Sequence, residues 1–409
     1  MYIKRHIESA LDRAAGMYPA VIVTGARQAG KTTLVRERAG GMKYVTLDDV
    51  RVRDLAENDP AIFFKTYEPP LILDEVQYAP KLFSAVKIIA DDARKNGMFY
   101  MTGSQAFHLM KNVTESLAGR VGIMELKGLS YREIRGIKYD RPFLPGTEHM
   151  ESVETEAGKP DYWEIWGVIQ KGSFPKIYEN DYDAEKREVF YNDYLRTYLE
   201  RDVRALTQVA DERAFLSFMT AAAALTGQPL NYETLSRSVG KDVNTIKRWL
   251  SILITSGLVY LLEPYHDNVL KRMAKTPKLH FMDTGLACFL CGWNTPKQLE
   301  SGAMSGAMFE TFAVSEIIKS FANAGIDPRL SLFYYRDGEK REIDLVIKRG
   351  GVLHPVEIKK AGGGAKKDIA AFELLKKGSL EVGAGALICM DETKAWLNGT
   401  DRIIPVNMI

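Results

Sequence analysis

The sequence predicts an α/β fold for the first 140 residues, with a parallel sheet and helices on both faces. Three observations support this prediction: short apolar runs alternate with helix-like segments, one run enters a glycine-rich turn, and another ends in two carboxylates. The predicted strands are Ala20–Thr24, Lys43–Leu47, Leu71–Leu73 and Phe99–Thr102. The predicted helices between them are Thr32–Ala39 and Lys81–Lys95.

The composition narrows the class of protein. A chain of 409 residues exceeds one ordinary core, so several domains are expected. No run of about 18 apolar residues occurs, which predicts a chain without a spanning helix. Lys and Arg number 55 against 53 for Asp and Glu, so net charge indicates no particular partner. Three cysteines and a start unlike a signal peptide favour the cytoplasm.

The glycine-rich turn matches the phosphate-binding pattern G-x-x-x-x-G-K-[ST] at every position. The predicted nucleotide ligands are Gly25, Ala26, Arg27, Gln28, Ala29, Gly30, Lys31, Thr32 and Thr33. Backbone N–H groups and a helix N-terminus suit the phosphates of ATP. Lys31 is expected to act catalytically on the β- and γ-phosphates, and the Thr32 hydroxyl to bind Mg²⁺. The alternative is a chance glycine turn, which the flanking strand and helix disfavour.

Two acidic residues follow the third predicted strand. Asp74 and Glu75 lie at its carboxyl end, the edge at which open α/β sheets bind ligands. Asp74 is predicted to bind Mg²⁺, and Glu75 to polarise the attacking water. A solvated acidic turn is the alternative, but it does not explain the apolar strand directly before the two carboxylates.

Two further catalytic candidates come from the segment after the fourth strand. Ser104, with Thr102 as the other choice, is placed to contact the γ-phosphate or the attacking water. Arg120 is a candidate arginine finger that acts across a subunit boundary, which implies a homo-oligomer. For Ser104 the alternative is a plain loop residue, and for Arg120 it is an ordinary surface arginine.

These motifs resemble those of the predicted AAA+ ATPases of bacteria and archaea that carry a C-terminal domain of unassigned function. The likeness rests on the phosphate-binding loop, on residues 73–77, 102–104 and 116–120, and on later segments. The later segments are Gly172–Pro175, Tyr198–Val203, Asp283–Ala287 and Glu342–Asp344. The resemblance implies an AAA+-like P-loop ATPase that uses ATP and Mg²⁺.

The middle of the chain is predicted to be mainly helical. Residues 141–160 are acidic and contain Pro and Gly, which favours a linker or exposed loop before a helical connector that reaches residue 210. Residues 211–270 are predicted to be winged-helix-like, with helices Tyr232–Val239 and Val243–Ser256 and a strand at Leu258–Leu262. The second helix of such a module can enter the DNA major groove. The alternative is a module used for packing or protein contact.

Residues 271–409 are predicted to form an α/β nuclease-like domain. Asp344 lies in one predicted strand, and Glu357 and Lys359 share a face of the next, antiparallel strand. With Glu310 at the start of an apolar helix, the set resembles the PD-(D/E)xK nucleases. The resemblance implies Mg²⁺ bound by the three carboxylates and Lys359 as a catalytic residue. A solvated, charged sheet face is the alternative.

Together these features predict an ATPase that couples its nucleotide state to DNA binding or processing. The alternative is a regulatory ATPase switch whose C-terminal domain binds nucleic acid or a protein partner without cleavage. Cys288 and Cys291 form a lone Cys-x-x-Cys pair without matching ligands at zinc spacing, so they are expected to be structural.

Overall fold

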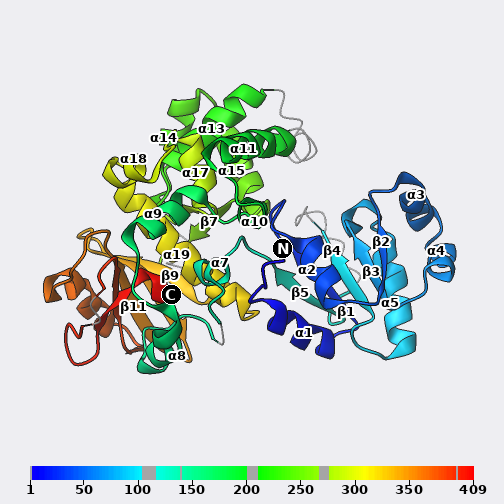
Figure 1. The fold of residues 1–409 in the computed structure, drawn as a ribbon, viewed down its shortest axis with the longest axis horizontal. Coiled ribbons are helices and arrows are strands. Elements are labelled where there is room, and N and C mark those ends of the chain that lie inside the picture. The colour runs from blue at the N-terminus through cyan, green and yellow to red at the C-terminus, as the bar shows by residue number, and fades with distance from the viewer. Residues whose placement is uncertain (1, 104–116, 139–140, 200–210, 267–275, 393–394) are drawn as a thin grey trace.

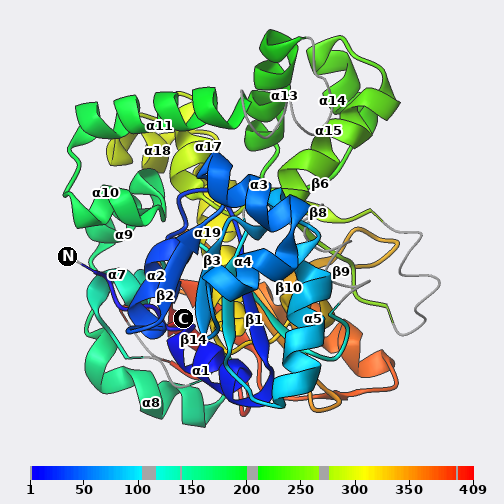
Figure 2. The same cartoon turned by 90° about the vertical axis from the view of Figure 1, so that its right-hand side faces the viewer.

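The computed structural model describes residues 2–103, 117–138, 141–199, 211–266, 276–392 and 395–409. The N-terminal region, coloured blue to cyan, lies beside the green-to-red remainder of the chain (Figure 1). In the view turned by 90°, the N-terminal sheet and its helices lie in front of the C-terminal strands (Figure 2). The phosphate-binding and nuclease-like motifs therefore belong to different parts of the molecule.

The N-terminal region contains a five-stranded sheet in the order β2-β3-β4-β1-β5, and all of its strands are parallel. The strands are β1 Ala20–Thr24, β2 Lys43–Thr46, β3 Leu71–Asp74, β4 Phe99–Thr102 and β5 Val121–Glu125. Since β4 separates β1 from β3, the carboxyl ends of these three strands are neighbours. The parallel sheet predicted from the sequence is confirmed.

Helices cover both faces of this sheet. They are α1 Glu8–Met17, α2 Lys31–Arg38, α3 Val50–Asn58, α4 Pro60–Thr66 and α5 Leu82–Ala93. Ile22 of β1 packs in a core with α3, α4 and α5, whereas its neighbour Val23 packs in a core with α1 and α2. This alternation follows from the two-residue period of a strand. Both faces are buried, which explains why β1 and β3 read as continuous apolar runs.

The middle of the chain is mainly helical, as predicted. Its helices are α7 Tyr131–Arg135, α8 Thr147–Ala157, α9 Tyr162–Lys171, α10 Pro175–Glu179, α11 Ala184–Tyr198, α13 Glu212–Ala224, α14 Tyr232–Val239, α15 Val243–Thr255, α17 Thr284–Leu290 and α18 Pro296–Ser301. A three-stranded antiparallel sheet has the order β6-β8-β7, with β6 Gln228–Pro229, β7 Val259–Leu262 and β8 Lys278–Phe281. In the described ranges, no helix has the length and apolarity needed to cross a membrane.

The segment expected to be a linker or exposed loop is different in the structure. Residues 147–157 form the helix α8, with buried Met150 and Val153 on its inner side. His149 of this helix is also buried, and its Nε2 donates to the carbonyl oxygen of Met408 at 2.7 Å. The acidic composition of the segment, with Pro and Gly residues around it, concealed this helix in the sequence.

The C-terminal region is built on a mixed sheet in the order β14-β13-β11-β10-β9, with β12 paired to β11. The strands are β9 Leu332–Arg336, β10 Glu342–Arg349, β11 Val352–Ile358, β12 Glu381–Val382, β13 Ala386–Cys389 and β14 Arg402–Pro405. β10 is antiparallel to β11, as expected. The long helix α19, Ser305–Asn323, is buried along most of its length.

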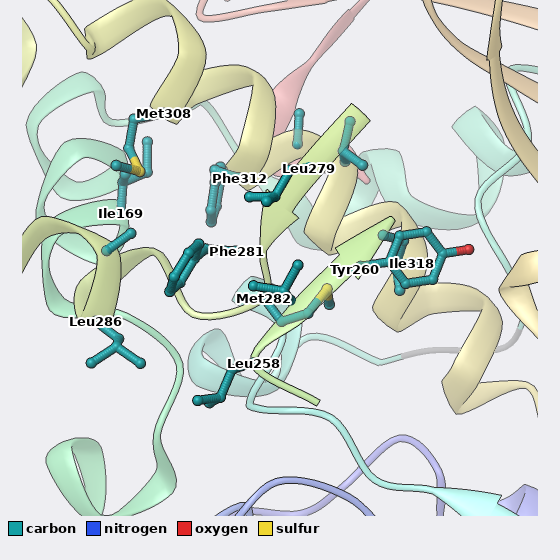
Figure 3. Packing of buried hydrophobic residues seen from close by; sticks show 14 of the residues in the cluster. Ile169, Leu258, Tyr260, Leu279, Phe281, Met282, Leu286, Met308, Phe312 and Ile318 are labelled. Atoms are coloured by element: carbon teal, nitrogen blue, oxygen red, sulfur yellow. The ribbon is translucent and has the colours of Figure 1, made fainter. Parts of the chain in front are cut away.

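One large hydrophobic core joins the middle and C-terminal regions. It extends from α7 and α9 through β7, β8 and α19 to the strands of the mixed sheet. Figure 3 shows Leu279 and Phe281 of β8 within this core, close to Phe312 of α19. β8 pairs with β7 across the boundary predicted at residue 270. The predicted domain limits stay predictions, but these two regions share one core.

Candidate functional site

The phosphate-binding loop joins β1 to α2 through an unusual backbone. Gly25 has φ 136° and Gly30 has φ 91°, both in a range that favours glycine. A Cβ on Gly25 would lie 2.1 Å from the carbonyl oxygen of Leu126 in the segment after β5, so no side chain fits there. Gln28 also has a positive φ, 60°. The two glycines of the motif are therefore required by the path of the chain.

Lys31 opens α2 and turns its amine back to the loop. The amine donates to the carbonyl oxygens of Gly25 at 3.0 Å and Ala26 at 2.9 Å. The residue is 6% exposed. The first N–H groups of a helix lack intrahelical partners, so the start of α2 presents donors beside this ammonium. Loop, amine and helix start together form an anion-binding arrangement.

Asp74 is the acidic residue at the end of β3, and three hydroxyl groups orient it. The Thr32 hydroxyl donates to Asp74 Oδ1 at 2.8 Å, the Tyr44 hydroxyl donates to Oδ2 at 2.7 Å, and Thr102 at the end of β4 also donates to Oδ1. Burial, followed by the hydrogen bond to Asp74, raises the pKa of Tyr44 to about 12, so this hydroxyl stays a donor. Thr32 and Asp74 together offer the oxygen ligands that Mg²⁺ prefers.

Glu75 follows Asp74 in a strained conformation. Its φ of 58° and ψ of 46° place a non-glycine residue in the left-handed region, which is uncommon. Its N–H donates to the Thr102 hydroxyl at 3.2 Å, and its carboxylate accepts a hydrogen bond from the Gln77 side chain. Strain of this kind concentrates at functional sites. Thr102 thus contacts both members of the acidic pair.

Ser104 and Arg120 are the two remaining catalytic candidates of the nucleotide site. Ser104 lies outside the described residues. Arg120 precedes β5 and ion-pairs with Asp91 of α5 at 2.5 Å. Its carbonyl oxygen accepts from the N–H of Ala20, the first residue of β1. Arg120 therefore lies at the edge of the sheet opposite the phosphate-binding loop, and its role as a finger in a neighbouring subunit stays a prediction.

Arg5 stabilises the phosphate-binding loop through hydrogen bonds to backbone carbonyl groups. The sequence did not predict this role. Its guanidinium donates to the carbonyl oxygens of Ala29 at 2.9 Å and Lys127 at 2.8 Å, and it ion-pairs with Glu133 at 3.1 Å. Although burial opposes ionisation of Glu133, the charge of Arg5 contributes to a pKa below the usual value. A lone arginine in a charged N-terminal segment carries no sequence signal for this role.

Two elements of the middle region contact the phosphate-binding loop. Gly257, just after α15, is so close that a Cβ on it would lie 3.5 Å from the backbone nitrogen of Ala26. A Cβ on Gly30 would lie 3.8 Å from Pro175, the first residue of α10. The nucleotide site, defined as residues 25–33 with Asp74, Glu75 and Thr102, is therefore flanked by another part of the chain.

The C-terminal candidates lie together between α19 and the mixed sheet. Asp344 Oδ2 accepts the N–H of Ile358 at 2.9 Å, which ties β10 to the end of β11. Lys359 pairs with Glu357 Oε1 at 2.7 Å, and in the described structure Glu357 Oε2 has no hydrogen-bond partner. Glu310 of α19 faces the same charges. We call Glu310, Glu342, Asp344 and Glu357 the carboxylate cluster.

A fifth residue, Lys278 of β8, lies in the middle of this cluster. Its amine is 2.8 Å from Glu310 Oε1, 2.5 Å from Glu342 Oε1 and 3.5 Å from Asp344 Oδ1. The residue is 2% exposed. Sequence reasoning missed it, although a lysine at the start of the apolar strand β8 was a visible signal.

Burial and mutual repulsion shift the pKa values in the carboxylate cluster. Burial raises the pKa of Glu310 to about 8, and the negative charge of Asp344 adds to the shift. The same two causes raise the pKa of Glu357 to about 7. Burial opposes the charge of Lys278, but the surrounding carboxylates raise its pKa and keep it an ammonium. One central cation thus compensates a crowded set of acids.

Three protein-family models match separate segments of the chain. A family model described as an AAA domain matches residues 17–135. Two models described as domains of unknown function, DUF8612 and DUF4143, match residues 163–297 and 305–409. The AAA match covers the parallel sheet and the phosphate-binding loop, and the last match covers the whole carboxylate cluster but not Lys278.

Several proteins are similar to this chain over much of its length. Uncharacterized proteins of Mycobacterium tuberculosis and Mycobacterium bovis are each 29% identical over 358 residues, which span 87% of this chain and 74% of theirs. A Walker-type ATPase of Pyrococcus abyssi has a TM-score of 0.42 at 15% identity, covering 71% of this chain and 96% of its own. The RuvB Holliday junction branch migration motor of Thermotoga maritima has a TM-score of 0.30 at 14% identity, covering 66% and 94%.

The sheet, the loop and the AAA-domain match define the N-terminal region as a P-loop ATPase fold of the AAA type. The C-terminal region is a mixed-sheet domain whose family description assigns it no function.

Proposed function

We propose that this chain binds ATP with Mg²⁺ and hydrolyses its terminal phosphate. The observation that carries the proposal is the 2.8 Å hydrogen bond from Thr32 to Asp74, which joins the phosphate-binding loop to the acidic strand end. Hydroxyl and carboxylate oxygens at this point fit a hard divalent cation. When bound, such an ion supplies positive charge beside the phosphate oxygens.

The side chains around Thr32 and Asp74 have different roles in the proposed hydrolysis. Lys31, held by two loop carbonyls, is placed to exchange those contacts for phosphate oxygens. Glu75 orients the attacking water and takes its proton as the oxygen approaches the phosphorus. Thr102 donates to the Asp74 carboxylate and accepts from the Glu75 N–H, so it fixes the Asp74 side chain relative to the backbone of Glu75.

We further propose that the nucleotide state is transmitted to the middle region. Gly257 and Pro175 lie next to the phosphate-binding loop, since a Cβ added at Gly257 would contact Ala26 and one added at Gly30 would contact Pro175. A loop that adjusts to phosphate would therefore move the end of α15 and the start of α10. In this role the protein is a switch, in which ATP turnover changes the conformation of the middle region.

DNA is the partner that we propose for this switch. The outer side of α15 exposes Asn244, Lys247 and Arg248, which are donors suited to phosphates and base edges. α14 and α15 lie on either side of a short turn, the arrangement that presents a second helix to the major groove. The contact from α15 through Gly257 to the loop gives ATP a route to this surface.

DNA cleavage by the C-terminal domain is the second candidate function. It is favoured by the placement of Asp344, Glu357 and Lys359 on neighbouring strands with Glu310 nearby. The contrasting possibility is that the domain binds its partner without cutting it. Both candidate functions are compatible with a homo-oligomer in which Arg120 contacts the ATP bound by a neighbouring subunit.

The variant Glu75→Gln tests ATP hydrolysis. It should retain ATP binding and lower turnover about 100-fold or more, because it removes the proton acceptor and keeps the shape. Phosphate release and the affinity for a fluorescent ATP analogue would be measured together. Lys31→Ala is the contrast, since it should lose affinity as well as turnover. Normal turnover in Glu75→Gln would remove Glu75 from its proposed role.

A further inference from the structure

The carboxylate cluster has a cation of its own, supplied by the chain. Carboxylates from α19 and β10 converge on the amine of Lys278, which comes from β8. All three distances lie between 2.5 and 3.5 Å. The resemblance of these sequence motifs to PD-(D/E)xK nucleases implies a metal ion at this set of carboxylates, so the identity of the cation decides what the cluster can do.

The residues present do not fit a catalytic metal ion. Oxygen ligands lie about 2.1 Å from Mg²⁺ and surround it, so the ion needs the space between the carboxylates. The Lys278 ammonium stands between Glu310 and Asp344, and two cations at one place repel strongly at low dielectric. Across the described ranges, no group of three or more His, Cys, Asp or Glu side chains has a geometry that could hold a metal ion.

Lys278 is also held firmly in this position. It lies opposite Pro229 of β6 and Leu262 of β7, so β8 has a partner strand on each side. Two residues along the same strand, His280 is buried, and its Nδ1 lies 3.2 Å from the Thr311 hydroxyl of α19. Two polar contacts therefore connect β8 to α19, one from Lys278 to Glu310 and one from His280 to Thr311. Strand pairing fixes the backbone of Lys278, while burial and the three carboxylates hold its ammonium in the cluster.

We infer that Lys278 replaces the divalent metal of a nuclease centre and makes the carboxylate cluster a charge-neutralised joint between the middle and C-terminal regions. The C-terminal domain then engages its partner without metal-dependent cleavage. The inference does not depend on ATP hydrolysis. It chooses between the two proposed roles of the C-terminal domain, because it favours binding without cutting.

Mn²⁺ binding to the nucleotide-free full-length chain tests the inference. Electron paramagnetic resonance of free Mn²⁺ would be compared between the wild type and Asp344→Asn, with Asp74→Asn included to identify binding at the ATPase site. Equal binding by the wild type and Asp344→Asn is expected. A wild-type Mn²⁺ site that disappears in Asp344→Asn would overturn the inference, as would Mg²⁺-dependent DNA cleavage that requires Asp344.

The variant Lys278→Met provides the positive test. This substitution removes the ammonium and keeps a side chain of similar length. It should raise the affinity of the carboxylate cluster for Mn²⁺ roughly tenfold or more. The gain should vanish in the double variant with Asp344→Asn. Lys319→Met is the matched control, because Lys319 is also buried and pairs with a single carboxylate, Glu316, at 2.7 Å. A folded Lys278→Met without added Mn²⁺ binding would contradict the inference, and the wild-type comparison decides the matter if this variant does not fold.

Discussion

The nucleotide site and the carboxylate cluster each hold an aspartate near the end or edge of a strand, but they hold it differently. Asp74 accepts hydrogen bonds from neutral hydroxyls, two of them from Thr32 and Tyr44. Asp344 faces the ammonium of Lys278 at 3.5 Å. Hydroxyls orient a carboxylate and leave its charge unbalanced, whereas an ammonium offsets part of it. The nucleotide site is therefore expected to bind an added cation, whereas the carboxylate cluster already contains one, the Lys278 ammonium.

This difference shows that a set of acidic residues does not define a metal site by itself. What decides is the charge of the groups that orient the acids. A buried carboxylate with neutral donors gains from a metal ion, while one paired with a buried lysine would first have to lose that partner. Two motifs that look equally acidic in sequence can therefore have opposite affinities for Mg²⁺.

The largest expected effects come from making the same substitution in both places. Asp74→Asn should lower ATP turnover about 100-fold with a small change in melting temperature. Asp344→Asn should leave turnover unchanged and cost about 1.5–3 kcal/mol of stability, because a charged acceptor of buried partners is lost. Phosphate release and urea denaturation of both variants would be compared. The contrast between the two sites would collapse if both variants lost turnover equally.

A second comparison tests whether the nucleotide site communicates with the middle region. Gly257 and Gly240 follow successive helix ends with nearly equal φ values, 72° and 70°, but only Gly257 lies against Ala26. Leucine at either position should cost about 1–2 kcal/mol of stability from the left-handed backbone. Only Gly257→Leu should also weaken ATP binding, by roughly tenfold. Equal ATP affinities in the two variants would argue against coupling through this contact.

A third comparison concerns a pH dependence of stability that originates in the carboxylate cluster. Burial raises the pKa of Glu310 from 4.5 to about 8, so the folded chain keeps a proton that the unfolded chain releases within this window. Stability should therefore fall as pH rises from 4.5 towards 8. Glu310→Gln cannot ionise, and it should flatten this slope in urea denaturation at about pH 5.5 and about pH 8.5. The exposed Glu339→Gln is the control, and an unchanged slope in Glu310→Gln would contradict this origin.

Much of the N-terminal fold was accessible from the sequence, because its signals are local. β1 and β4 were predicted with their observed limits, and the predicted limits of β2 and β3 each differ by one residue at one end. β5 was missed because Gly122 and alternating exposure interrupt its apolar pattern. The helix α8 was missed because its acidic composition, with Pro and Gly residues around it, reads as a loop. Both misses occur where tertiary packing overrides a weak local pattern.

The sequence by itself determined the phosphate-binding loop, the acidic strand end and the nearness of β10 to β11. Each depends on residues close together in the chain, where spacing and turn chemistry fix the geometry. Only the tertiary structure decided that Arg5 braces the loop, that Gly257 contacts it, and that Lys278 enters the carboxylate cluster. These partners are separated from their targets by tens to hundreds of residues. No local pattern encodes such contacts, because they arise only when separate elements pack around a shared core.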